Sequence, residues 1–441
     1  MKLFKLSFLI LLFVLSSCSS VSSLFSKNKK DEAETKLITE MSFKELSKLA
    51  KKGNTEAQLE LGKCYYEGDE VAKDLNEAVN WYRKAALQGL ADAQYNLGDC
   101  YYKGEGVAKN LNMALYWYRK AAEQNQPEAQ CALGNCYFNG EGVAKDRYQA
   151  FQLYRSAAFQ GVAEAQYNLG DCYNYGDGVQ KNWRSAIVYY HKAAEQGMAD
   201  AQRKLNGLLS EATKNTRTFT VKGVSFKMVP VKGDTFLMGA IDSDEEAYDQ
   251  EKPSHLVTLS NFSIGQTEVT QELWQAVMGT NPSRYKGSKR PVECVSWDDC
   301  QEFIDKLNSL TGRKFRFPTE AEWEYAASSA GKSKINYYAS DFSWYEYNSD
   351  NESHDVATKL PNELGIYDMI GNVFEWCRDS YLKYSPTSQT DPVSWDSWGV
   401  NWERVIRGGS FCTPSKRCRI TYRNGGKHSE RSSNWGLRLA L

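Results

Sequence analysis

The chain has 441 residues, which is too long for a single hydrophobic core and indicates two or three domains. Hydrophobic residues make up 41% of the chain and aromatic residues 13%, which is enough for packed globular units. The formal net charge is −1, so there is no global basic field to attract nucleic acid, and this balance argues against a nucleic-acid partner.

The first residues have the features of a targeting segment. Lys2 and Lys5 precede an apolar run, LSFLILLFVL, that is too short for a good transmembrane span and is typical of a signal peptide. It ends in LSSC, which resembles a bacterial lipoprotein cleavage box, and the resemblance implies cleavage before Cys18 and lipid on that cysteine. An ordinary secretory signal is the alternative. We therefore expect a signal peptide over residues 1–17 and a Ser- and Lys-rich tether over 18–40. The expected location is the bacterial cell envelope, with the protein lipid-anchored and facing the periplasm or the cell surface.

After this segment the sequence repeats itself with a period of 36 residues. The pair Ala-Gln recurs at this spacing, and LGxCY segments in the same register place four cysteines in one column, Cys64, Cys100, Cys136 and Cys172. Each unit has two apolar segments at helical spacing with glycines between them. A fixed period of this size indicates stacked helix pairs, so the sequence predicts an all-α solenoid over residues 41–212.

These repeats resemble the Sel1-like repeat, a relative of the tetratricopeptide repeat. Stacked helix pairs form an extended concave surface, so we expect a protein partner for this half. The column cysteines are expected to be small core residues rather than a metal or disulfide ladder. A stripe of tyrosine and tryptophan is likewise expected in the core rather than around a ligand, and no catalytic constellation occurs here.

The pattern changes at Phe219. Short β-prone runs replace the helical period, two amphipathic helices follow around Gln271–Met278 and Trp297–Leu310, and long stretches rich in Gly, Trp, Asn and Asp come next. This composition predicts one compact α+β domain over residues 219–441 with little regular secondary structure.

Eight motifs occur in order across this half: GDTFLMG (233–239), EKPSHLVTL (251–259), TEVTQELW (267–274), PVECVSW (291–297), RFPTEAEWEYAA (316–327), PNELGIYDMIGNVFEWCRD (361–379), RVIRGGSF (404–411) and NWGLRL (434–439). Together they resemble the sulfatase-modifying-factor family, whose founding activity is formylglycine generation. The resemblance implies that family's C-type-lectin-like α+β fold and bound calcium. It places the calcium ligands at the side chains of Asp368 and Glu375 and the carbonyl groups of Gly371 and Val373. Hard oxygen ligands of this kind suit Ca²⁺, and a carboxylate that caps a turn is the alternative.

Formylglycine generators oxidise a cysteine of a sulfatase peptide, and the resemblance implies two active-site thiols that bind copper(I). Copper(I) prefers thiolate to hydroxyl or carboxylate. Here Ser410 ends the GGS motif, Thr413 occupies the first thiol position and Cys418 matches the second. Cys412 stands one position early. It reaches Cys418 only if the TPSK segment between them turns back, which Pro414 favours.

Two hypotheses remain for the C-terminal half. In the first, it is a binding or maturation module that lacks the full copper pair. In the second, it is a copper- and oxygen-dependent oxidase that acts on a peptide or sulfatase substrate, with Cys412 and Cys418 as ligands and Ser410 positioning the substrate. Cys294, Cys300 and Cys377 are expected to pack or to form one disulfide. A three-histidine iron site is not expected, because the four histidines lie in different regions.

Overall fold

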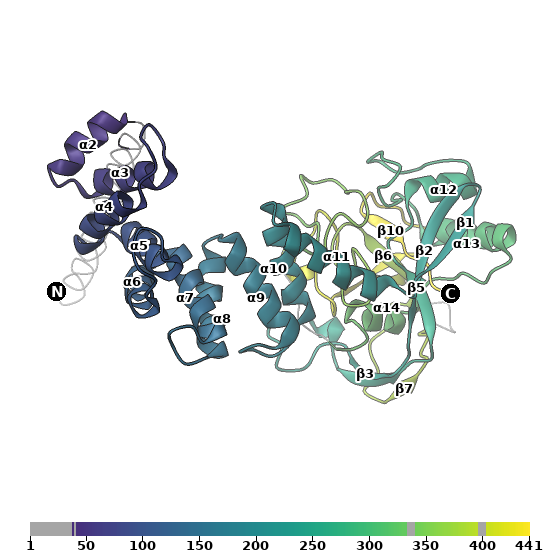
Figure 1. Cartoon of the computed structure of the whole chain (residues 1–441). Coiled ribbons are helices and arrows are strands. Elements are labelled where there is room, and N and C mark those ends of the chain that lie inside the picture. Colours follow the sequence, from purple (N-terminus) through teal and green to yellow (C-terminus); the bar gives the residue numbers. More distant parts are fainter. Residues whose placement is uncertain (1–37, 39–40, 333–339, 396–402) are drawn as a thin grey trace, which may run out of the picture. The chain divides into compact units, whose positions relative to one another are not determined.

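The computed structural model of the chain describes residues 38, 41–332, 340–395 and 403–441 (Figure 1). The expected signal peptide and nearly all of the expected tether, with Cys18, lie outside the described residues. The chain divides into two compact units. Unit 1 runs to Asn182 and adds Lys192–Met198, and unit 2 comprises Trp183–His191 and Ala199–Leu441.

Unit 1 is a series of helices in antiparallel pairs, which confirms the predicted solenoid (Figure 1). Asn54, Asp74, Asn110 and Asp146 cap helix N-termini with their side chains. The first helix of each repeat ends at a glycine in the left-handed conformation, as at Gly104 (φ 81°). The helices are α2 (Phe43–Lys51), α3 (Thr55–Glu67), α4 (Leu75–Leu87), α5 (Ala91–Lys103), α6 (Leu111–Glu123), α7 (Pro127–Asn139), α8 (Arg147–Phe159) and α9 (Ala163–Tyr175).

The LGxCY motif has a packing explanation. A Cβ atom at Gly98 would lie 2.8 Å from the ring of Tyr118, and a Cβ at Gly134 would lie 2.7 Å from the ring of Tyr154. Glycine is therefore needed where the tyrosine of the second helix crosses the first helix closely. Three of the four column cysteines pack as predicted, since Cys100, Cys136 and Cys172 are buried and carry free thiols, whereas Cys64 in the first repeat is only partly buried.

Unit 2 contains Trp183–His191 of helix α10, helix α11 and the C-terminal α+β domain. Two contacts connect these helices to the α+β domain. Arg184 of α10 donates a hydrogen bond to the Ser329 hydroxyl at 2.8 Å. Thr213 of α11 lies close to Gly365, where an added Cβ would be 2.6 Å from the Thr213 methyl group. The remaining elements are α10 (Trp183–Glu195), α11 (Ala199–Thr213), β1 (Arg217–Val221), β2 (Val224–Val231), β3 (Thr235–Met238), η1 (Asp249–Glu251), β4 (His255–Thr258), β5 (Phe262–Gly265), α12 (Gln271–Met278), α13 (Trp297–Thr311), α14 (Glu320–Ala327), β6 (Phe374–Ser380), β7 (Gln389–Thr390), β8 (Glu403–Arg407), η2 (Ser415–Arg417), β9 (Arg423–Lys427) and β10 (Trp435–Leu437).

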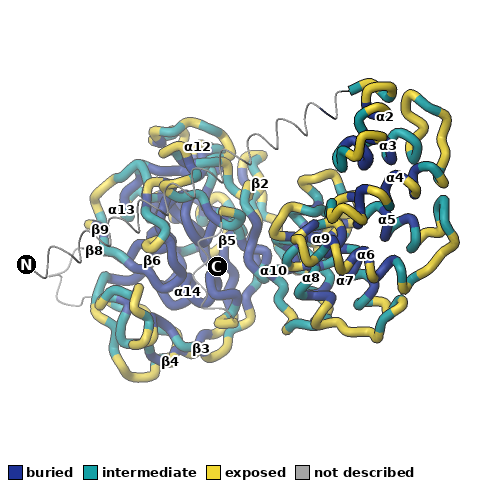
Figure 2. Tube along the Cα trace, turned by 90° about the vertical axis from the view of Figure 1, so that its left-hand side faces the viewer, coloured by how far each residue is buried: buried dark blue, intermediate teal, exposed yellow. Residues whose placement is uncertain are grey.

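Three small sheets organise this domain, in the strand orders β1-β2-β5, β10-β6-β8-β9 and β3-β4-β7. Helix α14 is buried along its whole length, and Figure 2 shows it in the dark blue interior. Trp323 of α14 and Trp376 of β6 are fully buried in the two main hydrophobic clusters. The α+β class with short elements is thus confirmed. Within the described residues, no helix is both long and apolar enough to cross a membrane.

Candidate functional site

The segment that carries both candidate thiols is the connection between β8 and β9. It begins with Gly408 (φ 99°) and Gly409 (φ 78°), a conformation that other residues rarely adopt. A Cβ at Gly409 would lie 2.6 Å from the Cys418 sulfur, so the turn brings the two ends of the segment together. The glycines of the GGS motif are therefore required by this close approach.

The segment Gly371–Asn372–Val373, which the resemblance associates with calcium, holds this turn in place. Gly371 donates its N–H to the Gly408 carbonyl at 2.8 Å, and Phe411 donates to the Asn372 carbonyl at 2.8 Å. The Ser349 hydroxyl donates to the Phe411 carbonyl at 2.7 Å. Two motifs that are far apart in the sequence thus form one local structure.

Three polar side chains and one thiol meet at this turn. The Asn434 amide donates to the Ser410 hydroxyl at 3.1 Å and approaches the Cys412 sulfur at 3.4 Å. The Ser410 hydroxyl lies 2.7 Å from the Thr413 hydroxyl and 3.5 Å from the Cys412 sulfur. Ser432 fixes the orientation of the amide by donating to the Asn434 carbonyl oxygen at 2.5 Å. Cys412 is exposed, so this cluster includes a solvent-accessible thiol.

The thiol of Cys418 has a different environment. It is buried, and its sulfur lies 3.6 Å from the Thr413 carbonyl and 3.9 Å from the Ser410 carbonyl. Burial raises the pKa of Cys418 to about 12, and the nearby Cys412 adds to this shift. Cys418 is therefore a protonated donor at neutral pH, bonded to the backbone of its own turn.

The arginines near these cysteines form buried ion pairs. Arg419 pairs with Glu251, and the Thr421 hydroxyl donates to the same carboxylate at 2.7 Å. Arg423 donates to both oxygens of Glu320, at 2.7 and 2.6 Å. Burying a charge is costly unless it is paired and hydrogen-bonded, and these contacts meet that condition. The arginines after Cys418 therefore anchor the turn to η1 and α14.

The copper site that the resemblance implies does not fit this arrangement. A linear or trigonal copper(I) site needs two thiolates aimed at one point. Here the exposed Cys412 lies against Asn434 and the Ser410 hydroxyl, whereas the buried Cys418 faces backbone carbonyls. Thr413, at the expected position of the first thiol, offers a hydroxyl that is already bonded to Ser410.

The calcium ligand set that the resemblance implies is only partly available in this structure. Glu375 accepts from Arg438 through both oxygens at 2.6 to 3.0 Å and from the Trp323 indole at 2.7 Å. A carboxylate has about four lone-pair sites, and these bonds use them. Asp368 accepts from the Ala357 N–H at 2.7 Å and has one buried oxygen without a partner. Only Asp368, with the carbonyl groups of Gly371 and Val373, remains from the implied set.

Near Asp368 and Glu375 lies a further carboxylate, that of Glu268, which sequence reasoning missed. Both oxygens of Glu268 are buried and have no hydrogen-bond partner. Desolvation, with the nearby Asp368 charge, raises the pKa of Glu268 well above its ordinary value. Together with Asp368, Glu268 thus leaves three buried carboxylate oxygens without a hydrogen-bond partner. The motif that carries Glu268, TEVTQELW, gave no signal of this burial.

The other three cysteines of the α+β domain are not bonded to one another. Cys294, Cys300 and Cys377 carry free thiols, which favours packing over a disulfide. In the part of the chain that the structure describes, no group of three or more His, Cys, Asp or Glu side chains is arranged to hold a metal ion. Asn434 is a second residue that sequence reasoning left without a role, because nothing in its spacing from Cys412 indicates contact.

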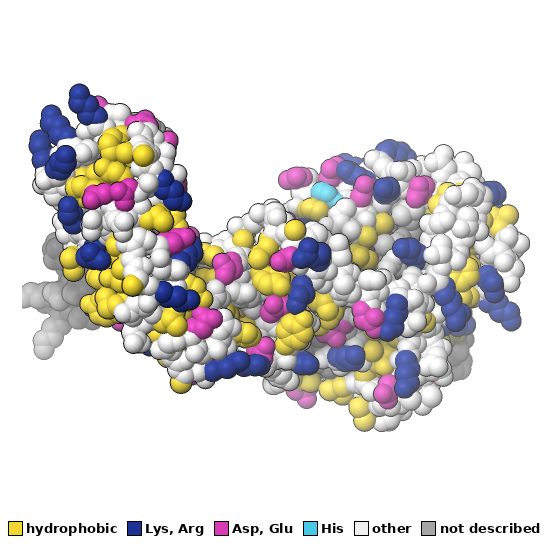
Figure 3. All heavy atoms as spheres, viewed as in Figure 1, with side chains coloured by type: hydrophobic (Ala, Val, Ile, Leu, Met, Phe, Trp, Pro, Cys, Tyr) yellow, Lys and Arg dark blue, Asp and Glu magenta, His cyan; other side chains and the backbone are white. Residues whose placement is uncertain are grey.

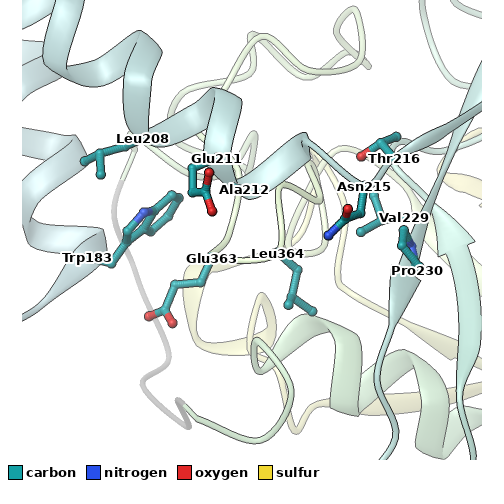
Figure 4. Close-up of a pocket in the computed structure, with 10 residues that line it drawn as sticks. All are labelled: Trp183, Leu208, Glu211, Ala212, Asn215, Thr216, Val229, Pro230, Glu363 and Leu364. Atoms are coloured by element: carbon teal, nitrogen blue, oxygen red, sulfur yellow. The ribbon is translucent and has the colours of Figure 1, made fainter.

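Unit 2 has a separate pocket of about 350 Å³ beside α10, α11 and β2. Figure 4 shows the Trp183 ring and the carboxylates of Glu211 and Glu363 around one side of the opening, with Leu364 nearby. The lining residues are Trp183, Leu208, Glu211, Ala212, Asn215, Thr216, Val229, Pro230, Glu363 and Leu364. None of the predicted site residues lies in this pocket.

Comparisons with known proteins agree with both halves of the architecture. Residues 214–441 match the family model described as sulfatase-modifying factor enzyme 1-like domain. Four Sel1 repeats match residues 55–90, 91–126, 127–162 and 163–198.

Three relatives illustrate the range of this family. The chain is 32% identical to the chaperone protein LppX of Paenibacillus barcinonensis over 254 residues, covering 45% of this chain and 83% of that protein. It is 30% identical to the formylglycine-generating enzyme of Streptomyces coelicolor over 201 residues, covering 38% of this chain and 60% of that protein. It is 27% identical to the inactive C-alpha-formylglycine-generating enzyme 2 of Bos taurus over 192 residues, covering 39% of this chain and 57% of that protein. The chain thus spans less than two thirds of the last two proteins. On the match to residues 214–441, the chain belongs to the sulfatase-modifying factor enzyme 1-like family, and it carries Sel1 repeats ahead of that domain.

Proposed function

We propose that this chain is an envelope protein whose repeats bind a protein partner and whose C-terminal domain serves the binding or maturation of that partner without copper chemistry. One observation carries the proposal: Thr413, at the position that the resemblance assigns to the first copper-binding thiol, carries a hydroxyl that is bonded to Ser410 at 2.7 Å. The name of LppX, a chaperone, supports a maturation role, and the name of the bovine relative shows that the family includes inactive members.

The repeats support the partner-binding half of the proposal. Stacked helix pairs present an extended surface rather than a single cavity, which suits a protein or peptide. Large hydrophobic side chains are exposed on unit 1, and Figure 3 shows hydrophobic patches between charged side chains over the repeat helices. These exposed residues are Leu87, Tyr116, Tyr148, Phe159 and Tyr175.

Lipid on Cys18 is a further part of the proposal, supported by the LSSC sequence after an apolar run. Mass spectrometry of the chain purified from membranes should find an acylated amino-terminal cysteine at this position. A Cys18→Ala variant should lose the modification and appear in the aqueous fraction. A wild-type chain without acyl groups would contradict the anchor and favour an ordinary secretory signal.

The second candidate function is formylglycine generation. It is favoured by the approach of both thiols to Ser410, Cys412 to its hydroxyl and Cys418 to its carbonyl. The test supplies copper(I), oxygen and a thiol reductant to the pure chain, together with a Cys-x-Pro-x-Arg peptide, and measures peptide aldehyde. The proposal predicts no aldehyde above the copper-only control. Aldehyde that disappears in Cys418→Ser would establish the oxidase instead.

Partner binding needs its own test. A photo-crosslinking residue at Tyr116 or Phe159, introduced singly, should trap a partner in intact cells, because both side chains are exposed on unit 1. If the chain matures that partner, deletion of the chain should lower the partner's folded amount. The same deletion complemented with Cys412→Ser should restore it, since this thiol is not used.

A further inference from the structure

A pocket of about 250 Å³ lies within the solenoid of unit 1. It is formed by α5, α6 and α7 with the start of α9, so three successive repeats contribute to it. Its lining residues are Tyr95, Asp99, Tyr102, Lys103, Tyr118, Glu128, Cys131, Ala132, Asn135, Val162 and Glu164.

One substitution within the repeat explains why space is left here. The residue after the recurring Ala-Gln pair is Leu59, Tyr95, Cys131 and Tyr167 in successive repeats. Cys131 is small, whereas the repeats on both sides place a tyrosine in the same column. The column therefore lacks one ring at the third repeat, and Cys131 lines the pocket.

Aromatic rings form part of the wall. Tyr95 stacks with Tyr118 at a centroid distance of 6.1 Å, and Tyr102 lies 6.4 Å from Tyr118. The Tyr118 hydroxyl donates to Asp99 at 3.4 Å. Tyr118 is buried between its neighbours, whereas Tyr95 and Tyr102 are only partly buried and offer ring surface to an aliphatic chain or a cation.

Negative charge converges on the same pocket. Three of the lining residues are acidic, Asp99, Glu128 and Glu164, and the one basic residue in the lining, Lys103, pairs with Asp99 at 2.6 Å. Glu128 accepts from the Gln126 amide at 2.6 Å, and Glu164 accepts from the Asn135 amide at 2.9 Å. These two partners are neutral, so they leave the charge of both carboxylates in place.

We propose that this pocket receives an arginine or lysine side chain of the protein that the repeats bind. The aliphatic stem packs on the tyrosine rings, and the cation pairs with Glu128 and Glu164. An arginine is favoured over a lysine because its planar fork stacks on tyrosine and donates to two carboxylates at once. The inference rests on the proposed partner binding by the repeats and is independent of any chemistry in the C-terminal domain.

Random peptides displayed on phage, selected against the full-length chain, test this inference. The selected peptides should share an arginine or lysine, and replacing that residue by glutamine should weaken binding about tenfold. Glu164→Gln should weaken binding to a similar extent, and added salt should reduce it. Glu56→Gln is the matched control, because Glu56 occupies the same column in the first repeat and does not line the pocket.

A second variant tests the shape of the pocket. Cys131→Tyr restores the ring of the neighbouring repeats and should abolish binding of the basic peptides, with circular dichroism confirming that the helices persist. Peptides that bind the repeats but carry no basic residue, or that bind Cys131→Tyr and Glu164→Gln as well as wild type, would overturn the pocket while leaving partner binding intact. Failure to select any repeat-binding peptide would count against both proposals.

Discussion

Arg438 places its guanidinium on the carboxylate of Glu375, with N–O distances of 2.6 to 3.0 Å, and both side chains are completely buried. Glu375 lies in β6, and Arg438 directly follows β10, the strand that pairs with β6. The pair also satisfies a carboxylate that the family resemblance assigns to calcium. The contact therefore has consequences for stability and for metal dependence.

Arg438→Met should destabilise unit 2 by about 3–5 kcal/mol, because it leaves Glu375 charged, buried and without its partner. Unfolding in urea, followed by tryptophan fluorescence, measures the loss. Arg431→Ala is the control, since Arg431 pairs with Asp299 at an exposed position and should cost less than about 1 kcal/mol. Equal losses of unfolding free energy in the two variants would show that the buried pair stabilises the domain no more than the exposed pair does.

Removal of calcium should leave the wild-type chain unchanged. Arg438 already provides the positive charge beside Glu375, and the four lone-pair sites of this carboxylate are used. The melting temperature in EDTA should therefore equal that in millimolar CaCl₂. A clear rise in melting temperature with calcium, lost in Asp368→Asn, would contradict this account and restore the ligand set that the resemblance implies.

Asp379 makes stability depend on pH. Burial, with the nearby Glu320 charge, raises the pKa of Asp379 from its ordinary value of 3.8 to about 7. Between these two values the folded state holds a proton that the unfolded state has lost, so the contribution of Asp379 to stability is greatest at low pH and declines as the pH rises toward 7. Asp379→Asn should remove this decline.

The measurement is the difference in unfolding free energy between wild type and Asp379→Asn from pH 4 to pH 8. The unfolding free energy of wild type, relative to that of the variant, should fall by several kcal/mol over this range, since each pKa unit is worth about 1.4 kcal/mol. A difference that stays constant with pH would show that Asp379 is ionised in the folded state throughout.

The repeat glycines are expected to be intolerant of substitution. Gly98→Ala should destabilise unit 1 by about 1–3 kcal/mol, because the added methyl group would lie 2.8 Å from the Tyr118 ring. Gly207→Ala is the control. Gly207 lies in α11 with nothing within 4 Å of an added Cβ, so alanine should stabilise by about 0.5–1 kcal/mol. Thermal unfolding distinguishes these opposite signs.

The solenoid could be predicted from the sequence because its contacts are local and repeated. Residues 36 apart occupy equivalent places, so one column of cysteines predicts one column of buried side chains, which holds for Cys100, Cys136 and Cys172 and in part for Cys64. The α+β class was also predictable, from short β-prone runs and from the family resemblance carried by the motifs.

The polar interior of unit 2 could not be predicted in the same way. Arg438 and Glu375 are 63 residues apart, and Arg423 and Glu320 are 103 apart. No local period relates such pairs, and only the fold brings them together. The same holds for Asn434, which reaches Ser410 and Cys412 from another motif. The substitution of Thr413 for the first thiol was visible in the sequence, but its bond to Ser410 was not.

The central claim is that the native thiols do not form a copper(I) site, and a copper(I) titration against a chromogenic chelator tests it most directly. We expect the chain to leave the metal with the chelator, and Cys412→Ser and Cys418→Ser to behave like wild type. Thr413→Cys is the positive control. The new thiol would lie beside Ser410, and the backbone carbonyl of residue 413 lies 3.6 Å from the Cys418 sulfur. This variant should therefore bind one copper(I) per chain. Stoichiometric copper(I) uptake by the wild-type chain that is lost in both cysteine variants would contradict the account.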